Sequence, residues 1–132
     1  MTIQLWCLLA GVMLPYVWAG TSVPFRIRQF SNVDLKEPRV QAEKLVEAGA
    51  RTWGAQSNAW EALAVFAVAN LAAMMVGVDP AGDWSTAAMI WVAARLLHGI
   101  FYINNIAPAR VLCFATGMGM SVWIIVMALT QS

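Results

Sequence analysis

Four long apolar stretches constrain the fold of this chain more than any other feature of its sequence. They cover roughly residues 3–25, 55–77, 84–105 and 110–130. A helix needs about 20 apolar residues to cross a bilayer, so each stretch is long enough. Lipid cannot satisfy backbone polar groups, so only helices and closed barrels cross a membrane. Because no alternation typical of barrel strands is present, we expect an all-α integral membrane four-helix bundle formed by one domain, residues 1–132.

The composition excludes several other classes of protein. Charged residues make up 11% of the chain, whereas a soluble domain carries about 25%, so this is not an ordinary soluble domain. The net charge of +1 is too small to indicate a nucleic-acid partner. Cys7 and Cys113 both lie in apolar stretches, so we expect neither a disulfide framework nor a metal site.

The charges that are present predict the topology. Most of them lie within residues 26–51, and we expect a cytoplasmic loop over 26–54 that is helical from 39 to 52 and continues into the second span. Lys and Arg favour the cytoplasmic side of a membrane, while the loop between the second and third spans carries only Asp79 and Asp83. Both termini are therefore expected away from the cytoplasm. The seven tryptophans mostly fall near span ends, as interfacial anchors do.

The first apolar stretch resembles a secretory signal in one respect. Val17, Trp18 and Ala19 look like a small-residue cleavage site. No Lys or Arg precedes Arg26, however, and the apolar run is long for the core of a signal peptide. We therefore expect this stretch to be retained as a span.

Ionisable side chains inside two of the stretches are the strongest indication of function. A charged residue at the centre of a span costs about 2.5–3.5 kcal/mol on insertion scales, and Glu61 and Arg95 are such residues. Glu61 follows Arg51 by ten residues, and Arg95 precedes the end of the third span by ten. At 1.5 Å per residue, both lie about 15 Å from the same membrane face. Two antiparallel helices would therefore pair Glu61 with Arg95 and, by the same argument, Asn58 with His98.

Polar side chains also form one stripe on each of these two spans, at spacings of i, i+3, i+7 and i, i+7, i+10. An excess of positive charge suits an anionic ligand, because arginine donates two parallel hydrogen bonds to a carboxylate. The pattern therefore predicts a groove for a small zwitterion with more than one carboxylate, whose ammonium group suits the one acidic side chain. The stripes consist of Arg95, His98 and Tyr102 on the third span and Arg51, Asn58 and Glu61 on the second, with Arg110 at the mouth of the groove.

A structural interpretation of the same residues stays open. Glu61 and Arg95 would neutralise each other and fix the register of the two helices. His98 would bond Asn58, and Tyr102 would anchor its helix at the interface. Packing needs only one polar pair, however. Several more polar side chains lie on the same two stripes, at matching depths in the membrane.

Three segments together resemble the MAPEG superfamily, the membrane-associated proteins in eicosanoid and glutathione metabolism. They are residues 51–61 (RTWGAQSNAWE), 95–102 (RLLHGIFY) and 106–110 (IAPAR), and the resemblance covers nearly the whole chain. It implies a homotrimer of four-helix subunits in which glutathione, as co-substrate, binds between neighbouring subunits in the cytoplasmic half of the membrane. The sequence resembles the plainer bacterial members, which implies a bacterial inner membrane.

The resemblance implies a catalytic role for Arg110. A free thiol has a pKa of about 8.5, and a guanidinium nearby favours the thiolate. One departure is Gly54, which stands where glutathione-using members carry an arginine that helps to hold a carboxylate. The resemblance further implies glutathione-binding roles for Arg51, Gln56, Asn58, Glu61, Arg95, His98 and Tyr102.

The expected function is a membrane-bound glutathione-dependent transferase or peroxidase. It would activate the glutathione thiol for attack on a lipophilic electrophile or hydroperoxide that enters from the membrane lipid. Gly54 keeps a second hypothesis open, a non-catalytic member that binds a small anion or a lipid. A third is a scaffold that binds a protein partner through the charged helix 39–52. A transporter is disfavoured, because four spans give little from which to build alternating access.

Overall fold

The structure is a computed structural model that describes residues 2–131, and all regular elements in that range are helices. Four of the helices are long and apolar enough to cross a membrane, and the fifth is short. The prediction of an all-α chain with four membrane-length helices is therefore confirmed. The helices are α1 (Thr2–Phe30), α2 (Pro38–Glu43), α3 (Glu47–Val76), α4 (Asp83–Ile103) and α5 (Ala107–Gln131).

Local sequence signals define the ends of the long helices. Gly77 ends α3 in the left-handed conformation at φ 75°, and the next amide, of Val78, donates to Ala73 O at 3.0 Å. This is a glycine-based helix stop. Asp83 lies in the first turn of α4, where a negative charge is favourable, and Pro108 lies in the first turn of α5, where no amide partner is lost.

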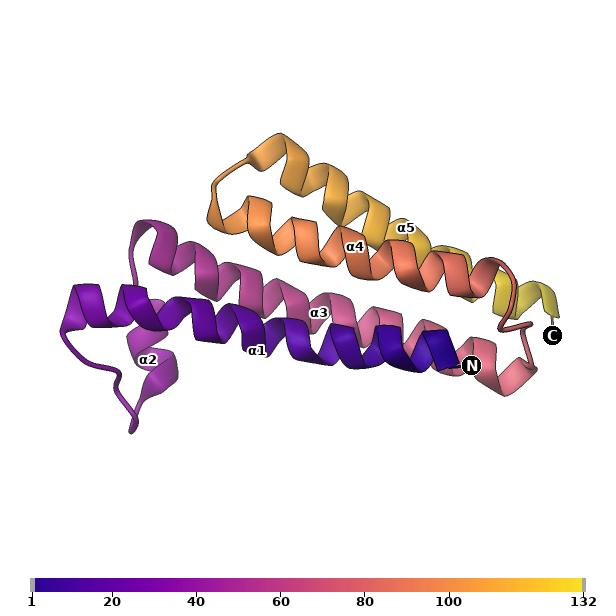
Figure 1. Ribbon diagram of the computed structural model, residues 1–132, viewed down its shortest axis with the longest axis horizontal. Coiled ribbons are helices and arrows are strands. Elements are labelled where there is room, and N and C mark those ends of the chain that lie inside the picture. Colours follow the sequence, from indigo (N-terminus) through magenta and orange to yellow (C-terminus); the bar gives the residue numbers. More distant parts are fainter. Residues whose placement is uncertain (1, 132) are drawn as a thin grey trace.

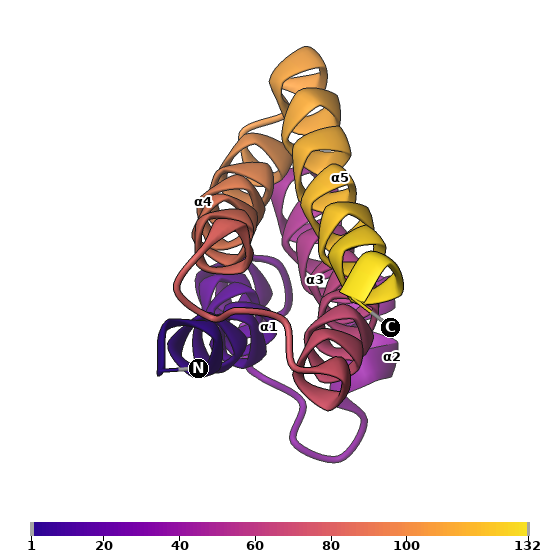
Figure 2. The ribbon, with the colours of Figure 1, turned by 90° about the vertical axis from the view of Figure 1, so that its right-hand side faces the viewer.

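The four long helices form two antiparallel pairs (Figure 1). Helix α1 packs along α3, and α4 packs along α5. Viewed along the bundle, α3 contacts all three of the other long helices (Figure 2). Both termini lie at the end of the bundle opposite α2 (Figure 1). The connection between α4 and α5 lies at the same end as α2.

Small residues allow the helices to approach closely, as is usual in membrane bundles. The ring of Trp91 stacks on Phe66 with centroids 3.8 Å apart. Trp18 packs against Gly99 so closely that a Cβ atom there would lie 2.1 Å from Trp18 Cζ2. Together with Trp84, these tryptophans are buried in the core. These three rings therefore pack inside the bundle, where small residues on neighbouring helices make room for them.

The predicted helix over residues 39–52 is interrupted, and this expectation was wrong in part. Helix α2 ends at Glu43, and α3 begins only at Glu47, which has φ 50°. The side chain of Gln29 stabilises this interruption. Its Nε2 donates a hydrogen bond to Lys44 O at 2.8 Å, and its Oε1 accepts one from the Val46 amide at 3.1 Å. The break turns Leu45 inward, where it is buried. From Glu47 onward the helix does continue into the second span.

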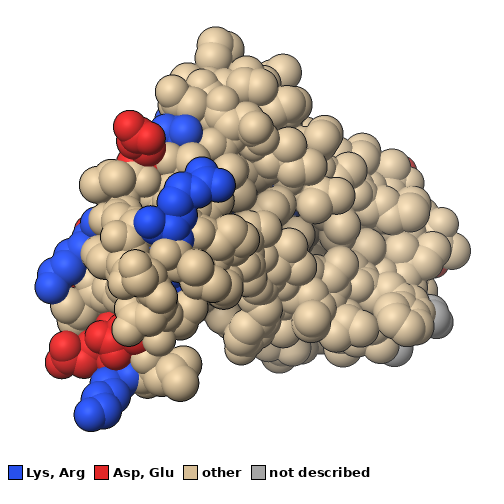
Figure 3. Space-filling model, turned by 60° about the vertical axis from the view of Figure 1, so that its left-hand side comes forward, with Lys and Arg blue, Asp and Glu red and all other residues tan. Residues whose placement is uncertain are grey.

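The charged side chains gather at the α2 end of the molecule (Figure 3). The loop before α2 is organised by Asp34, whose Oδ1 accepts hydrogen bonds from the amides of Glu37 at 3.0 Å and Lys36 at 2.9 Å. These bonds stabilise the carboxylate and lower the pKa of Asp34 from its ordinary value. Arg26 fastens α2 to α1, because its Nη1 donates to Pro38 O at 2.8 Å.

Candidate functional site

A cavity of about 210 Å³ lies between α3, α4 and α5, toward the α2 end of the bundle. It brings together side chains from three helices that are far apart in sequence. Four predicted site residues share this cavity, and two apolar residues of α5 complete its wall. The lining residues are Asn58, His98, Tyr102, Arg110, Val111 and Phe114.

Arg110 is the accessible cation of this cavity. It lies in the first turn of α5, where its side chain extends across the ring of Tyr102. The guanidinium carbon lies 4.5 Å from the centroid of that ring, a distance at which a cation is attracted to the aromatic face. Within residues 2–131 the Arg110 guanidinium forms no ion pair, so its charge is available to an anion.

Arg95 forms its hydrogen bond with a different residue from the predicted partner, Glu61. Its Nη2 donates to Asn58 Oδ1 at 2.6 Å, and among the described residues it makes no ion pair with Glu61. Asn58 in turn donates from Nδ2 to Glu61 Oε2 at 3.5 Å. The predicted pairing of Glu61 with Arg95 and Asn58 with His98 was therefore wrong by one turn. The long side chain of Arg95 reaches Asn58, which lies about one helical turn before Glu61. The Asn58 amide connects the guanidinium to the Glu61 carboxylate.

His98 lines the cavity with part of its hydrogen-bonding capacity unused. Its side chain is 3% exposed, and its Nδ1 is buried without a hydrogen-bond partner. The imidazole meets the Tyr102 ring edge-on, at a centroid distance of 5.7 Å. Buried polar atoms in proteins are usually bonded, so an unpartnered nitrogen beside a cavity is consistent with a ligand-binding role.

Arg51 and Gln56 do not line this cavity. Arg51 Nε donates to Ile103 O at 2.9 Å, so it satisfies a free carbonyl at the end of α4. Gln56 lies two residues from Asn58, and helix geometry directs such residues to nearly opposite sides. The structure accordingly places Gln56 in a second pocket between α1, α2 and α3.

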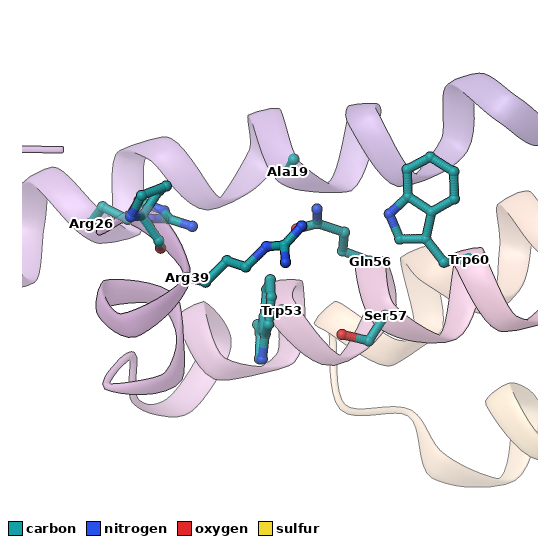
Figure 4. Close-up of a pocket in the computed structure, with 8 residues that line it drawn as sticks. Ala19, Arg26, Arg39, Trp53, Gln56, Ser57 and Trp60 are labelled. Atoms are coloured by element: carbon teal, nitrogen blue, oxygen red, sulfur yellow. The ribbon is translucent and has the colours of Figure 1, made fainter. Parts of the chain in front are cut away.

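The second pocket has a volume of about 460 Å³ and is also cationic (Figure 4). Arg39 of α2 and Gln56 of α3 extend into the space beside α1, between the rings of Trp53 and Trp60 (Figure 4). The sequence places Arg26 and Arg39 in the charged segment of residues 26–51 and gives neither of them a binding role. The spacing of Arg26 four residues after Ser22, which it bonds at 3.1 Å, is the one sequence signal for its inward position.

Glu61 lies on the outside of the bundle. It is exposed and falls near the middle of α3. Its Oε2 accepts a hydrogen bond from Asn58 Nδ2 at 3.5 Å, which joins the carboxylate to the arginine network. A charge in this position would be costly if the side chain faced lipid.

These features define a class of protein: an α-helical membrane protein with an arginine-lined cavity between its helices at one end. Comparison with protein families then identifies the chain more closely. It belongs to the MAPEG family, whose model matches residues 3–130. Neither the comparison with curated proteins nor that with solved structures gives a match. Family membership and the four apolar helices together indicate a multi-pass integral membrane protein.

Proposed function

We propose that this protein is a glutathione-dependent transferase or peroxidase that works within the membrane. The family to which it belongs includes enzymes of both kinds. The observation that carries the proposal is the cavity in which Arg110, without an acidic partner among residues 2–131, faces Asn58 and His98. A cation without a counter-charge, beside hydrogen-bonding groups and the apolar side chains of Val111 and Phe114, suits a thiol co-substrate and an apolar second substrate.

Arg110 would act by stabilising charge. The guanidinium is always protonated and favours the thiolate of glutathione over the thiol, and the released proton passes to solvent. In a transferase reaction, the thiolate sulfur forms a bond to an electrophilic carbon, and the leaving group or the opened epoxide oxygen takes up a proton. In a peroxidase reaction, the sulfur attacks the O–O bond, the alkoxide leaves as an alcohol, and a second glutathione converts the resulting sulfenic acid to a disulfide with loss of water.

The protein is proposed to work as a homotrimer with glutathione between neighbouring subunits. Asn58 and Gln56 lie on opposite sides of α3, so one copy cannot direct both at one small ligand. If the second pocket of one copy faces the exposed Glu61 of the next, Arg39 and Gln56 join the first cavity. The same contact would cover the Glu61 carboxylate with positive charge.

We also propose that the α2 end faces the cytoplasm of a bacterial cell and that both termini lie on the other side of its inner membrane. The concentration of charge at the α2 end supports this orientation (Figure 3). Reporter fusions to the C-terminus would test it, because a reporter active only outside the cytoplasm should be active there.

Replacing Arg110 is the test of the function. Glutathione is titrated into the purified full-length protein, and the ultraviolet absorbance of the thiolate is recorded. Wild type should give a saturable signal, and Arg110→Ala should lower the thiolate fraction at least about tenfold. Arg28→Ala is a matched control, since Arg28 is exposed at the end of α1 beside Phe25, and it should keep the signal. A wild-type protein with no signal would contradict the proposal.

A second candidate function is a non-catalytic family member that binds a small anion or lipid. The observation that favours it is the commitment of two predicted ligand-binding arginines to the protein itself. Arg95 is bonded to Asn58, and Arg51 to Ile103 O. Binding of phosphate or an anionic lipid without binding of millimolar glutathione would support this alternative. The scaffold hypothesis has less support, because the continuous charged helix on which it relied is broken at residues 44–46.

A further inference from the structure

We propose that Gly54 is a positioning residue for Arg110. It leaves a space on α3 that the ring of Tyr102 fills, and that ring in turn holds the guanidinium of Arg110 over the cavity. The part of this inference that concerns glutathione rests on the proposed function. The packing of the three residues does not depend on any ligand.

The first step is the contact between Gly54 and Tyr102. A Cβ atom at position 54 would lie 2.6 Å from Tyr102 Oη and 2.8 Å from both Cε1 and Cζ of the ring. Atoms that are not bonded to each other do not approach so closely. Any side chain at position 54 would therefore push the phenol away from α3.

The second step is the contact between Tyr102 and Arg110. The same ring that packs against Gly54 also contacts Arg110, whose guanidinium carbon lies 4.5 Å from the ring centroid. The edge-on contact with His98 limits the ring on a further side. Because the ring contacts Gly54, His98 and Arg110 together, displacing it from α3 would change its contacts with the imidazole and the guanidinium.

This geometry gives Gly54 a packing role in the site. Compared with family members that carry an arginine here, the position looked like the loss of a ligand contact. In the folded chain the missing side chain is replaced in space by the Tyr102 ring. Gly54 and Tyr102 thus form one contact, and this contact positions the guanidinium of Arg110.

A ligand-free experiment tests the contact itself. The chain has two tyrosines, Tyr16 and Tyr102, so full-length protein labelled with fluorotyrosine in a Tyr16→Phe background gives one fluorine resonance. Gly54→Ala and Arg110→Ala should each shift that resonance. Gly119→Ala is the matched control, because a Cβ there would meet nothing within 4 Å, and it should leave the resonance unchanged. A resonance unmoved by Gly54→Ala would overturn the proposal.

The consequence for the site is tested by the pH midpoint of glutathione thiolate formation. Gly54→Ala and Tyr102→Leu should each raise that midpoint by about one pH unit, a tenfold loss of thiolate at fixed pH. The double variant should do no more than either single one, because residues that act in series are not additive. Gly119→Ala is again the control, because a Cβ there would meet nothing within 4 Å, and it should keep the wild-type midpoint. Additive effects, or an unchanged midpoint in Gly54→Ala, would refute the link.

The remaining outcomes are also decisive. If Gly54→Ala fails to assemble and adding Tyr102→Leu restores assembly, the steric contact is supported. If assembly is not restored, Gly54 has another role and the proposal fails. A wild-type protein with no thiolate signal contradicts the proposed function alone, and the fluorine experiment then decides the contact independently.

Discussion

Arg95 illustrates how single polar groups are accommodated inside this bundle. Its side chain is 3% exposed, and its charge is satisfied by an uncharged amide rather than by a carboxylate. Asn58 therefore has two roles. It accepts a hydrogen bond from Arg95, and it also lines the cavity. Burial of an ion is tolerated only when its hydrogen bonds are made, so this amide contributes to stability as well as to the site.

The Asn58→Ala variant should therefore be less stable than wild type. Loss of the acceptor leaves a buried guanidinium unsatisfied, which costs about 1–3 kcal/mol. Thermal unfolding in detergent measures the change. The control is Asn104→Ala, since Asn104 is exposed and bonds only within its own helix, to Ile100 O at 2.8 Å. Equal effects of the two substitutions would contradict the assigned role of Asn58.

Pairs of helices are held together by large rings set against small residues. The contact of Trp18 with Gly99 joins α1 to α4, and that of Trp91 with Gly11 joins α4 to α1 again, where a Cβ on Gly11 would lie 3.0 Å from the ring. Asn70 adds a polar link, because its Oδ1 accepts from Trp84 Nε1 at 2.8 Å. The spacing between helices is therefore set by a few residues.

Gly99→Ala should force α1 and α4 apart. The added methyl group would overlap the Trp18 ring, and such overpacking costs about 1–3 kcal/mol. The unfolding temperature of the purified protein should fall. Gly20→Ala makes the same chemical change in α1 with nothing within 4 Å of the new atom, and it should be neutral. A neutral Gly99→Ala would mean that the helices can separate without loss.

The loop before α2 should loosen in acid. The pKa of Asp34 is lowered in the folded state by its bonds from the amides of Glu37 and Lys36. Its contribution is therefore complete above the ordinary value of about 3.9 and is lost as the pH falls through the lowered pKa. Amide hydrogen exchange at residues 36 and 37 should show protection falling over this range, relative to neighbouring amides. In Asp34→Asn, the amide oxygen still accepts, and this pH dependence should disappear.

For the molecule as a whole, the position of its charged groups bears on the proposed assembly. Glu61 is exposed at the middle of α3, and the two cationic pockets open on different sides of that helix. A membrane cannot solvate such groups well. Association of several copies, with unlike faces of α3 in contact, would resolve both features together.

The expected assembly is three copies, with the Glu61 face of one against the Gln56 face of the next. Native mass spectrometry should give the trimer mass. In a background lacking Cys7 and Cys113, the pair Glu61→Cys and Gln56→Cys should form disulfides between copies, because the two positions lie on opposite sides of one helix. Neither single variant should give the cross-linked trimer. A monomeric mass, or the absence of cross-links, would disprove this arrangement.

The four long helices can be predicted from the sequence, because the length of an apolar stretch and its end signals are local properties of the chain. The sequence also predicts that His98, Tyr102 and Arg110 lie toward one end, since rise per residue fixes depth along a helix. These are statements about one helix at a time. The charged segment of residues 26–51 was likewise readable, although the break before Glu47 was not, because it depends on the distant side chain of Gln29.

Which polar groups contact each other depends on how the helices pack. The rotation of each helix about its axis and the reach of each side chain join Arg95 to Asn58 instead of Glu61, and they send Gln56 to a separate pocket. The burial of Trp18 and the packing of Tyr102 on Gly54 depend on small residues of another helix. Contacts between helices follow from packing in three dimensions, which depth and periodicity along one chain do not specify.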